Sequence, residues 1–223
     1  MAYSKALKFL FTLSFVVILT VNGAARASES ASPQGAAEFV EMLSQVAIWT
    51  SEIGDRSKKK AAIRNLIDVG FNFEVISQFV LGNIWYRTSA VQRAEFKDLF
   101  AEYAVDSYES HFNRISAITV VASNRVAHGD FLVQTTIDGA SDSAKVVWQV
   151  RAWDSEYQVI DILIDGKSLA MIHRSEFTSV VQKEGLEKLM QALRNRTPTN
   201  VFMRVEDVER RSPHRQHQKS KRM

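Results

Sequence analysis

The sequence has no cysteine among its 223 residues, and it has only three prolines and nine glycines. Without cysteine there is neither a disulfide framework nor a thiol nucleophile. The chain also lacks a glycine-rich phosphate loop, a dinucleotide-binding fingerprint, and the HExxH and GxSxG motifs of hydrolases. The common sequence signals of catalysis are therefore missing, and we expect neither a metal nor a cofactor.

The titratable side chains do not gather into a catalytic or metal-binding motif. His111 is a lone histidine in a helical pattern, which is typical of a packed or surface side chain. His214 and His217 have a spacing that binds a metal weakly, but no third ligand accompanies them. Asp161 and Asp165 lie four residues apart in a strand pattern, which separates them by about 13 Å, too far for joint acid–base work.

Positive charge is scarce in the central part of the chain. The whole sequence has 28 basic and 25 acidic residues, but residues 28–196 contain 18 basic and 22 acidic ones. Nucleic-acid-binding domains concentrate positive charge on the folded face that meets phosphates. A mildly acidic domain of about 170 residues, long enough for one real core, therefore argues against a nucleic-acid partner.

Both ends of the sequence differ from this central part. Lys5 and Lys8 precede an apolar run over residues 9–21, and small residues follow at 25 and 27, which predicts a cleaved secretory signal peptide over residues 1–27. The apolar run is short for a membrane span, although an uncleaved anchor is the alternative. Since no cysteine follows the cleavage site, a lipoprotein anchor is excluded. Residues 197–223 form a basic tail that we expect to be disordered, and it either contacts an anionic membrane or is solvated without a role.

Helical periodicity dominates residues 33–112. Ser32 is suited to cap a first helix that begins at Pro33 and runs toward Gly54. A second helix is predicted over residues 56–69, and a short one over 73–81 that ends at Gly82. Apolar residues then recur every three to five positions over residues 89–112, which predicts one long helix.

The long predicted helix has an unusually aromatic apolar side. Ser89 and Gln92 have the spacing of a capping box at its start. Its apolar stripe comprises Phe96, Leu99, Phe100, Tyr103, Ala104, Tyr108 and Phe112. We expect this stripe to pack on an apolar surface elsewhere in the domain.

After residue 116 the period changes to that of strands. Four runs rich in β-branched and aromatic residues are separated by short turn clusters, which predicts consecutive antiparallel strands. Arg151 and Asp161 are placed for a cross-strand ion pair. The runs cover residues 117–126, 130–138, 144–153 and 157–165. Their alternation puts the following residues on one apolar face: Phe131, Val133, Thr135, Ile137, Val146, Trp148, Val150, Ala152, Ile160, Ile162 and Ile164.

These elements predict an α+β fold. Two further helices, over residues 174–184 and 186–195, follow the strands and are separated by Gly185. We expect a four-stranded antiparallel meander covered by N-terminal and C-terminal helices, with the apolar sheet face and the aromatic stripe as partners. The apolar layers either fill a core or enclose a pocket. The pattern alone therefore leaves open a ligand carrier, a small-molecule enzyme with a conical hydrophobic pocket, and a structural adaptor with a solid core.

Two segments of the chain resemble the MlaC, or toluene-tolerance, family. The first covers residues 75–108 and the second covers residues 159–193; the similarity as a whole extends over residues 36–196. The signature positions of the first segment are Leu81-Gly82, Trp85-Tyr86, Thr88-Ser89, Gln92-Arg93, Phe96, Phe100 and Tyr103. Those of the second segment are Asp161, Gly166, Ser168, Arg174, Phe177, Gly185 and Leu189.

The resemblance implies a periplasmic lipid carrier without enzymatic activity. Members of the family hold a phospholipid between sheet and helices and pass it between an outer-membrane lipoprotein complex and an inner-membrane ABC transporter with an MCE-domain ring. Relatives encoded with hopanoid biosynthesis genes share the ending seen here as residues 174–177, which makes a hopanoid the alternative ligand. The chain departs from the family at residues 90–91, where a proline is common, and by its basic tail.

Strand alternation and the helix stripe, rather than the signature positions, suggest which side chains contact lipid. They belong to the short helix, the long helix and the three last strands. The predicted lipid-binding residues are Phe79, Phe100, Tyr103, Phe112, Val133, Trp148, Val150, Ile160 and Ile162.

Overall fold

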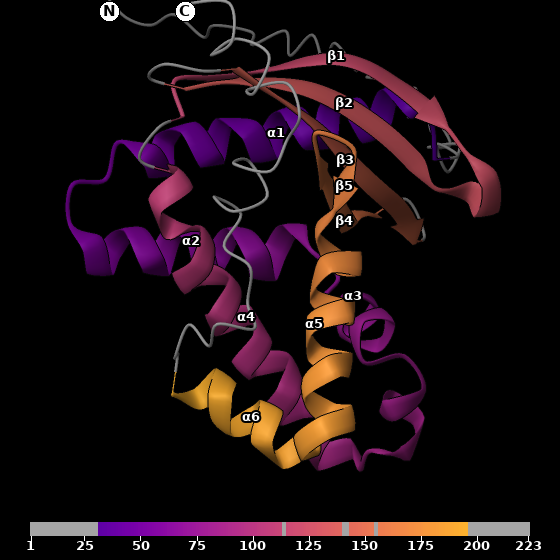
Figure 1. Cartoon of the computed structure of the whole chain (residues 1–223). Helices are drawn as coiled ribbons and strands as arrows, with labels where there is room; N and C mark the ends of the chain where they lie inside the picture. Colours follow the sequence, from indigo (N-terminus) through magenta and orange to yellow (C-terminus); the bar gives the residue numbers. More distant parts are fainter. Residues whose placement is uncertain (1–30, 113–114, 140–142, 154–155, 196–223) are drawn as a thin grey trace, which may run out of the picture.

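The computed structural model describes residues 31–112, 115–139, 143–153 and 156–195, which form an antiparallel sheet and helices (Figure 1). The predicted signal peptide and basic tail lie outside the described residues. None of the described helices is long and apolar enough to span a membrane. The helices are α1 (Pro33–Ser51), α2 (Arg56–Gly70), α3 (Phe73–Leu81), the 3₁₀ helix η1 (Gly82–Arg87), α4 (Ala90–Phe112), the 3₁₀ turn η2 (Ala127–Gly129), α5 (Leu169–Glu184) and α6 (Leu186–Arg194). The strands are β1 (Ala117–Arg125), β2 (Phe131–Asp138), β3 (Ser143–Trp153), β4 (Glu156–Ile164) and β5 (Lys167–Ser168).

Side-chain caps begin the helices where the sequence predicts them. The Ser32 hydroxyl accepts a hydrogen bond from the Gly35 N–H at 3.1 Å, at the start of α1. Ser89 and Gln92 form the expected capping box before α4: the Ser89 Oγ accepts from the Gln92 N–H and the Gln92 Oε1 accepts from the Ser89 N–H, both at 3.2 Å. The α+β class and the long helix are thereby confirmed.

The sheet has five strands, in the order β1-β2-β3-β4-β5, rather than the four that we predicted. Its additional strand is two residues long, too short to show a period in the sequence. Asp165 and Gly166 form the connecting turn, and both have positive φ, at 48° and 78°. This backbone reverses the chain in two residues, so that Lys167 pairs with Ile164.

A β-bulge alters the predicted alternation in β4. Trp148 pairs with Ile162, but Val150 pairs with Val159, which leaves Ile160 as the extra residue. Consequently Val159 takes the inner-face position beside Val150 that alternation gave to Ile160. A single extra residue of this kind leaves no mark in a hydrophobic pattern.

The first helix, rather than the long one, covers the inner face of the sheet (Figure 1). Ser123 Oγ donates to the Pro33 carbonyl oxygen at 2.6 Å, and Ser51 Oγ donates to the Ile115 carbonyl oxygen at 3.2 Å. These two bonds hold α1 along β1 from end to end. The expected pairing of the aromatic stripe with the sheet is therefore wrong, except at Phe112, which packs against the sheet core.

Three apolar clusters make up the interior. The first joins α3, η1, α4, α5 and α6, the second joins α1 to the sheet, and the third joins α2 to α4. Phe71, between α2 and α3, packs against all three clusters. Next to it, the Asn72 N–H donates to the Val159 carbonyl oxygen at 2.9 Å, which ties this junction to the edge of β4.

The cross-strand ion pair of Arg151 forms with Asp130 rather than with Asp161. Arg151 donates to both carboxylate oxygens of Asp130, at 2.6 and 2.9 Å, and Gln149 donates at 2.8 Å. Burial of Asp130 favours its neutral form, but the hydrogen bonds from Arg151 and Gln149 outweigh this effect and lower its pKa.

We expect Asp130→Asn to lower the free energy of unfolding by about 1–2 kcal/mol at pH 7, because the Arg151 side chain is partly solvated. Since the pKa of Asp130 is lower in the folded state, the ionised carboxylate stabilises the fold above its unfolded pKa of about 3.9 and ceases to do so as the pH falls through the folded pKa. The difference from wild type should therefore shrink below about pH 4. Urea unfolding at pH 7 and pH 3 measures it.

Asp98→Asn is the matched control, since the Asp98 carboxylate is 70% exposed and lies 3.8 Å from Arg64. We expect this control to change stability by less than about 0.5 kcal/mol at either pH. An Asp130→Asn variant as stable as wild type at pH 7 would show that the ion pair contributes nothing.

Candidate functional site

The inner face of the sheet is fully covered at one end and only half covered at the other. Strand pairing places Phe131, Val150 and Val159 in one row across β2, β3 and β4, and each is 0% exposed. Toward the other end of these strands the apolar side chains become partly accessible. The half-covered side chains at that end are Ile118, Val120, Ile137, Ile162 and Ile164. We call these five residues, together with Phe112, the half-covered sheet end.

The half-covered sheet end is apolar in its immediate surroundings. Trp148, which pairs with Ile162, has its ring beneath this region and is 7% exposed. Its indole N–H donates to Thr135 Oγ1 at 3.0 Å, so that the polar atoms of both side chains are bonded to each other. Such a surface binds hydrocarbon by burial and offers a polar ligand little.

The predicted lipid-binding residues separate into three places. Phe112, Val133, Trp148, Val150 and Ile162 belong to the cluster under the sheet, where Val133 and Val150 are 0% exposed. A second group, in the helical cluster, and two outlying residues are treated next. The sequence-based list thus mixes the half-covered sheet end with other surfaces.

Phe100 and Tyr103 pack within the helical cluster. Phe100 is 2% exposed, and its ring centroid lies 5.2 Å from that of Phe177. Neither residue has Trp148 as a ring neighbour among the described contacts. Phe79 is 40% exposed on the outside of α3, and Ile160 lies in the bulge of β4.

A buried polar chain runs between α4 and α5. Tyr108 Oη and His173 Nε2 are 2.8 Å apart, and His173 Nδ1 lies 3.4 Å from Glu176 Oε2. Burial raises the pKa of Tyr103, beside this chain, to about 12, and burial also raises the pKa of Tyr108. Both phenols therefore keep their protons at physiological pH and serve as hydrogen-bonding groups.

The signature residues of the second segment hold the start of α5. Asp161 accepts hydrogen bonds from the Ser168 hydroxyl and from the Ala170 N–H, and Ser168 Oγ accepts from the Met171 N–H at 3.0 Å. Because of this double cap, α5 begins at Leu169, five residues before the predicted start. Asp161 therefore has a structural role at the helix end.

Gly82 and Arg174, from different signature segments, meet in space. Gly82 has φ of 55°, and a Cβ there would lie 2.9 Å from Arg174 Nη2. The guanidinium of Arg174 also donates to the Phe79 carbonyl oxygen at 2.8 Å. Glycine thus permits the backbone turn after α3 and the close approach of the arginine.

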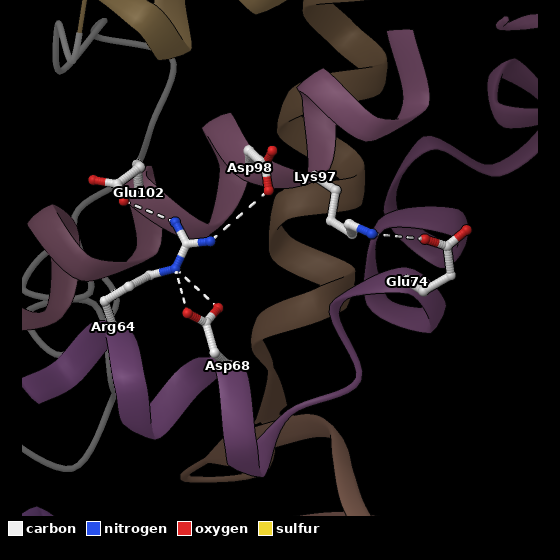
Figure 2. A network of polar contacts seen from close by, with 6 residues as sticks. All are labelled: Arg64, Asp68, Glu74, Lys97, Asp98 and Glu102. Atoms are coloured by element: carbon white, nitrogen blue, oxygen red, sulfur yellow. Dashed lines mark hydrogen bonds and ion pairs between the residues drawn. The ribbon is translucent and has the colours of Figure 1, made fainter. Parts of the chain in front are cut away.

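Charged contacts fix the long helix against its neighbours (Figure 2). Arg64 of α2 donates to Glu102 of α4 at 2.7 Å, and Lys97 of α4 donates to Glu74 of α3 at 3.3 Å. The network drawn comprises Arg64, Asp68, Glu74, Lys97, Asp98 and Glu102. It positions α4, and hence Phe112 at its end. Within the described ranges no three His, Asp or Glu side chains are arranged to hold a metal.

The residues that the sequence did not single out are Phe71, Ile118, Ile137, Ile164 and Val159. Ile137 and Ile164 appeared in the strand alternation, but nothing in the sequence showed that α1 leaves them half covered. Coverage depends on how far one helix extends along the sheet. That length of overlap is set by tertiary packing.

The chain is an α+β protein in which helices cover an antiparallel sheet to an extent that varies along its strands. The family model described as "MlaC protein" matches residues 38–195, and the chain therefore belongs to the MlaC family. A solved structure with the same fold is that of a phospholipid-binding protein from Ralstonia solanacearum in complex with a phospholipid. The two chains share 22% identity at a TM-score of 0.62, over 72% of this chain and 96% of the other. No curated protein sequence matches the chain.

Proposed function

We propose that this chain is a periplasmic carrier that buries the acyl chains of a phospholipid against the half-covered sheet end. The observation that supports it most directly is the row of half-covered aliphatic side chains on an otherwise buried sheet face. Membership of the MlaC family supports the role, and so does the phospholipid bound to a protein of the same fold.

The physical need for such a carrier is large. A 16-carbon acyl chain exposes about 0.8 kcal/mol per methylene to water, or roughly 13 kcal/mol in all, which prevents free diffusion between membranes. A protein removes this barrier by covering the chain with apolar side chains. Transport of this kind needs no nucleophile or general base.

The proposed lipid contacts come from α4 and from the inner sheet face. Phe112, Trp148 and Ile162 are retained from the sequence-based set, and Ile118, Ile137 and Ile164 join them. Val133 and Val150 lie behind these residues in the covered part. Phe100 and Tyr103 line the helical side of the interior, where the Tyr108–His173 pair places polar atoms nearest to the lipid.

The carrier would exchange lipid with an outer-membrane lipoprotein complex and an inner-membrane ABC transporter with an MCE-domain ring. A secretory signal peptide over residues 1–27 fits this location. A hopanoid is the alternative ligand, since its ring system is equally apolar. The enzyme alternative has one candidate base, His173, whose two ring nitrogens face Tyr108 and Glu176.

Lipid carried by the purified protein tests this proposal. We expect mature protein isolated from the periplasm to yield phospholipid on organic extraction, and native mass spectrometry to show a protein–lipid complex. Recovery of a hopanoid instead would change the ligand but keep the carrier. Protein that holds no lipid, and takes none up from vesicles of its own membrane lipids, would refute the carrier.

A further inference from the structure

Two exposed aromatic rings and two arginines form one surface where α3, η1 and α5 meet. Tyr86 is 71% exposed, and its hydroxyl accepts a hydrogen bond from Gln78 Nε2 at 2.8 Å. Phe79 is 40% exposed, and the Arg174 guanidinium lies over its ring, 5.0 Å from the centroid. Arg87 follows Tyr86 in the chain. We call Phe79, Tyr86, Arg87 and Arg174 the aromatic–arginine surface.

The fold explains the buried neighbour of this surface but not its exposed rings. Trp85 and Tyr86 form the aromatic pair of the first signature segment. Trp85 is 3% exposed in the helical cluster, whereas Tyr86 faces water. Large exposed apolar groups gathered in one place are typical of interaction sites.

The charge of this surface is unneutralised within the described part of the chain. Arg174 bonds a carbonyl oxygen and a ring face, and Arg87 has no carboxylate partner among the described residues. Other arginines do form ion pairs with carboxylates: Arg56, Arg64, Arg151 and Arg194. A matching partner surface must therefore bring negative charge together with apolar area.

We propose that the aromatic–arginine surface docks an acidic face of a membrane-anchored protein, from which or to which the carrier passes its lipid. The proposal rests on the proposed function for the purpose of docking, but not for the contact itself. The surface lies on the helical side of the molecule, formed by elements other than the sheet strands (Figure 1). Docking there leaves the half-covered sheet end to the lipid.

The fixed geometry of the side chains favours a protein partner over a bare bilayer. Arg174 and Tyr86 are each held by a hydrogen bond, so that binding orders them at little further cost in entropy. Tyrosine and arginine are also the residue types that dominate protein–protein binding energy. Attraction of two arginines to an anionic bilayer supplies only about 2 kcal/mol, which is too weak for stable contact.

Binding to membrane vesicles tests the docking surface independently of lipid loading. The full mature chain is sedimented with inner- and outer-membrane vesicles from its source cells, with the same vesicles after protease treatment, and with protein-free vesicles of the extracted lipids. Wild type should bind the native vesicles of at least one membrane, and protease treatment should abolish binding. Tyr86→Ala and Arg87→Glu should each weaken binding at least tenfold, and added salt should weaken the wild-type interaction.

Two control variants alter exposed residues outside the surface: Val121→Ala on β1 and Lys58→Glu on α2. Both should bind as wild type does. Wild-type affinities in Tyr86→Ala and Arg87→Glu would overturn the docking surface. Equal wild-type binding to protein-free vesicles would replace the protein partner with the bilayer and also overturn it.

The lipid content of each variant is measured separately by extraction. Folded variants that carry lipid but fail to bind native vesicles support the docking surface. Wild-type protein that binds native vesicles through Tyr86 and Arg87 but never carries lipid would keep this surface and refute the carrier. The two proposals therefore fail on different observations.

Discussion

Ile162→Asp should abolish lipid retention while the protein still folds. Ile162 lies on the half-covered sheet end and pairs with Trp148 across β3 and β4. A carboxylate there faces acyl chain in the loaded protein but reaches water in the empty one, because the side chain is half covered. The variant should lose about 3 kcal/mol of lipid affinity, or about 100-fold, as unpaired charge in hydrocarbon is strongly disfavoured.

Extraction of phospholipid per mole of folded protein measures this loss, and circular dichroism confirms the fold. Val121→Asp is the matched control, since Val121 is 64% exposed on β1. It should keep its lipid. Full lipid content in folded Ile162→Asp would remove the half-covered sheet end from the proposed site. Val150→Asp is less informative, because Val150 is 0% exposed and a charge there threatens the fold itself.

Phe100→Ala should destabilise the protein strongly and leave lipid content per folded molecule unchanged. The ring of Phe100 is 2% exposed and meets those of Phe73, Phe96 and Phe177 at centroid distances of 5.2–5.8 Å. Its removal leaves a cavity in the helical cluster, which typically costs about 3–5 kcal/mol. The melting temperature should fall by about 10 °C.

Val91→Ala is the control on the same helix, where the side chain is 77% exposed and should matter by less than about 0.5 kcal/mol. Thermal and urea unfolding, with lipid extraction at a temperature where both proteins are folded, separate stability from binding. If Phe100→Ala lost its lipid at nearly full stability, Phe100 would belong to the lipid site rather than to the core.

Local chemistry made most of the elements predictable. Ser32 before Pro33, and Ser89 three residues before Gln92, cap helices as their sequence context indicates. The beginning of α5 was not predictable in this way, because its cap depends on Asp161, which lies eight residues earlier on β4. That contact exists only after the β4–β5 turn has formed.

The candidate site was less predictable than the fold. An aromatic stripe on α4 and an apolar sheet face suggested each other as partners, yet α1 takes the sheet and α3 and α5 take Phe100. Periodicity identifies an apolar face but not its neighbour. Whether Ile164 is covered or half covered depends on the placement of a helix more than a hundred residues away in the chain.

Phe71 gives this small protein a mechanical unity. Because one side chain packs against all three apolar clusters, and Asn72 beside it is bonded to β4, no cluster can separate from the others without disturbing this junction. The sheet and the helical part should therefore not hinge freely like two rigid halves. Space for a lipid would instead arise from side-chain rearrangement around the half-covered sheet end, with the two layers held at a nearly constant separation.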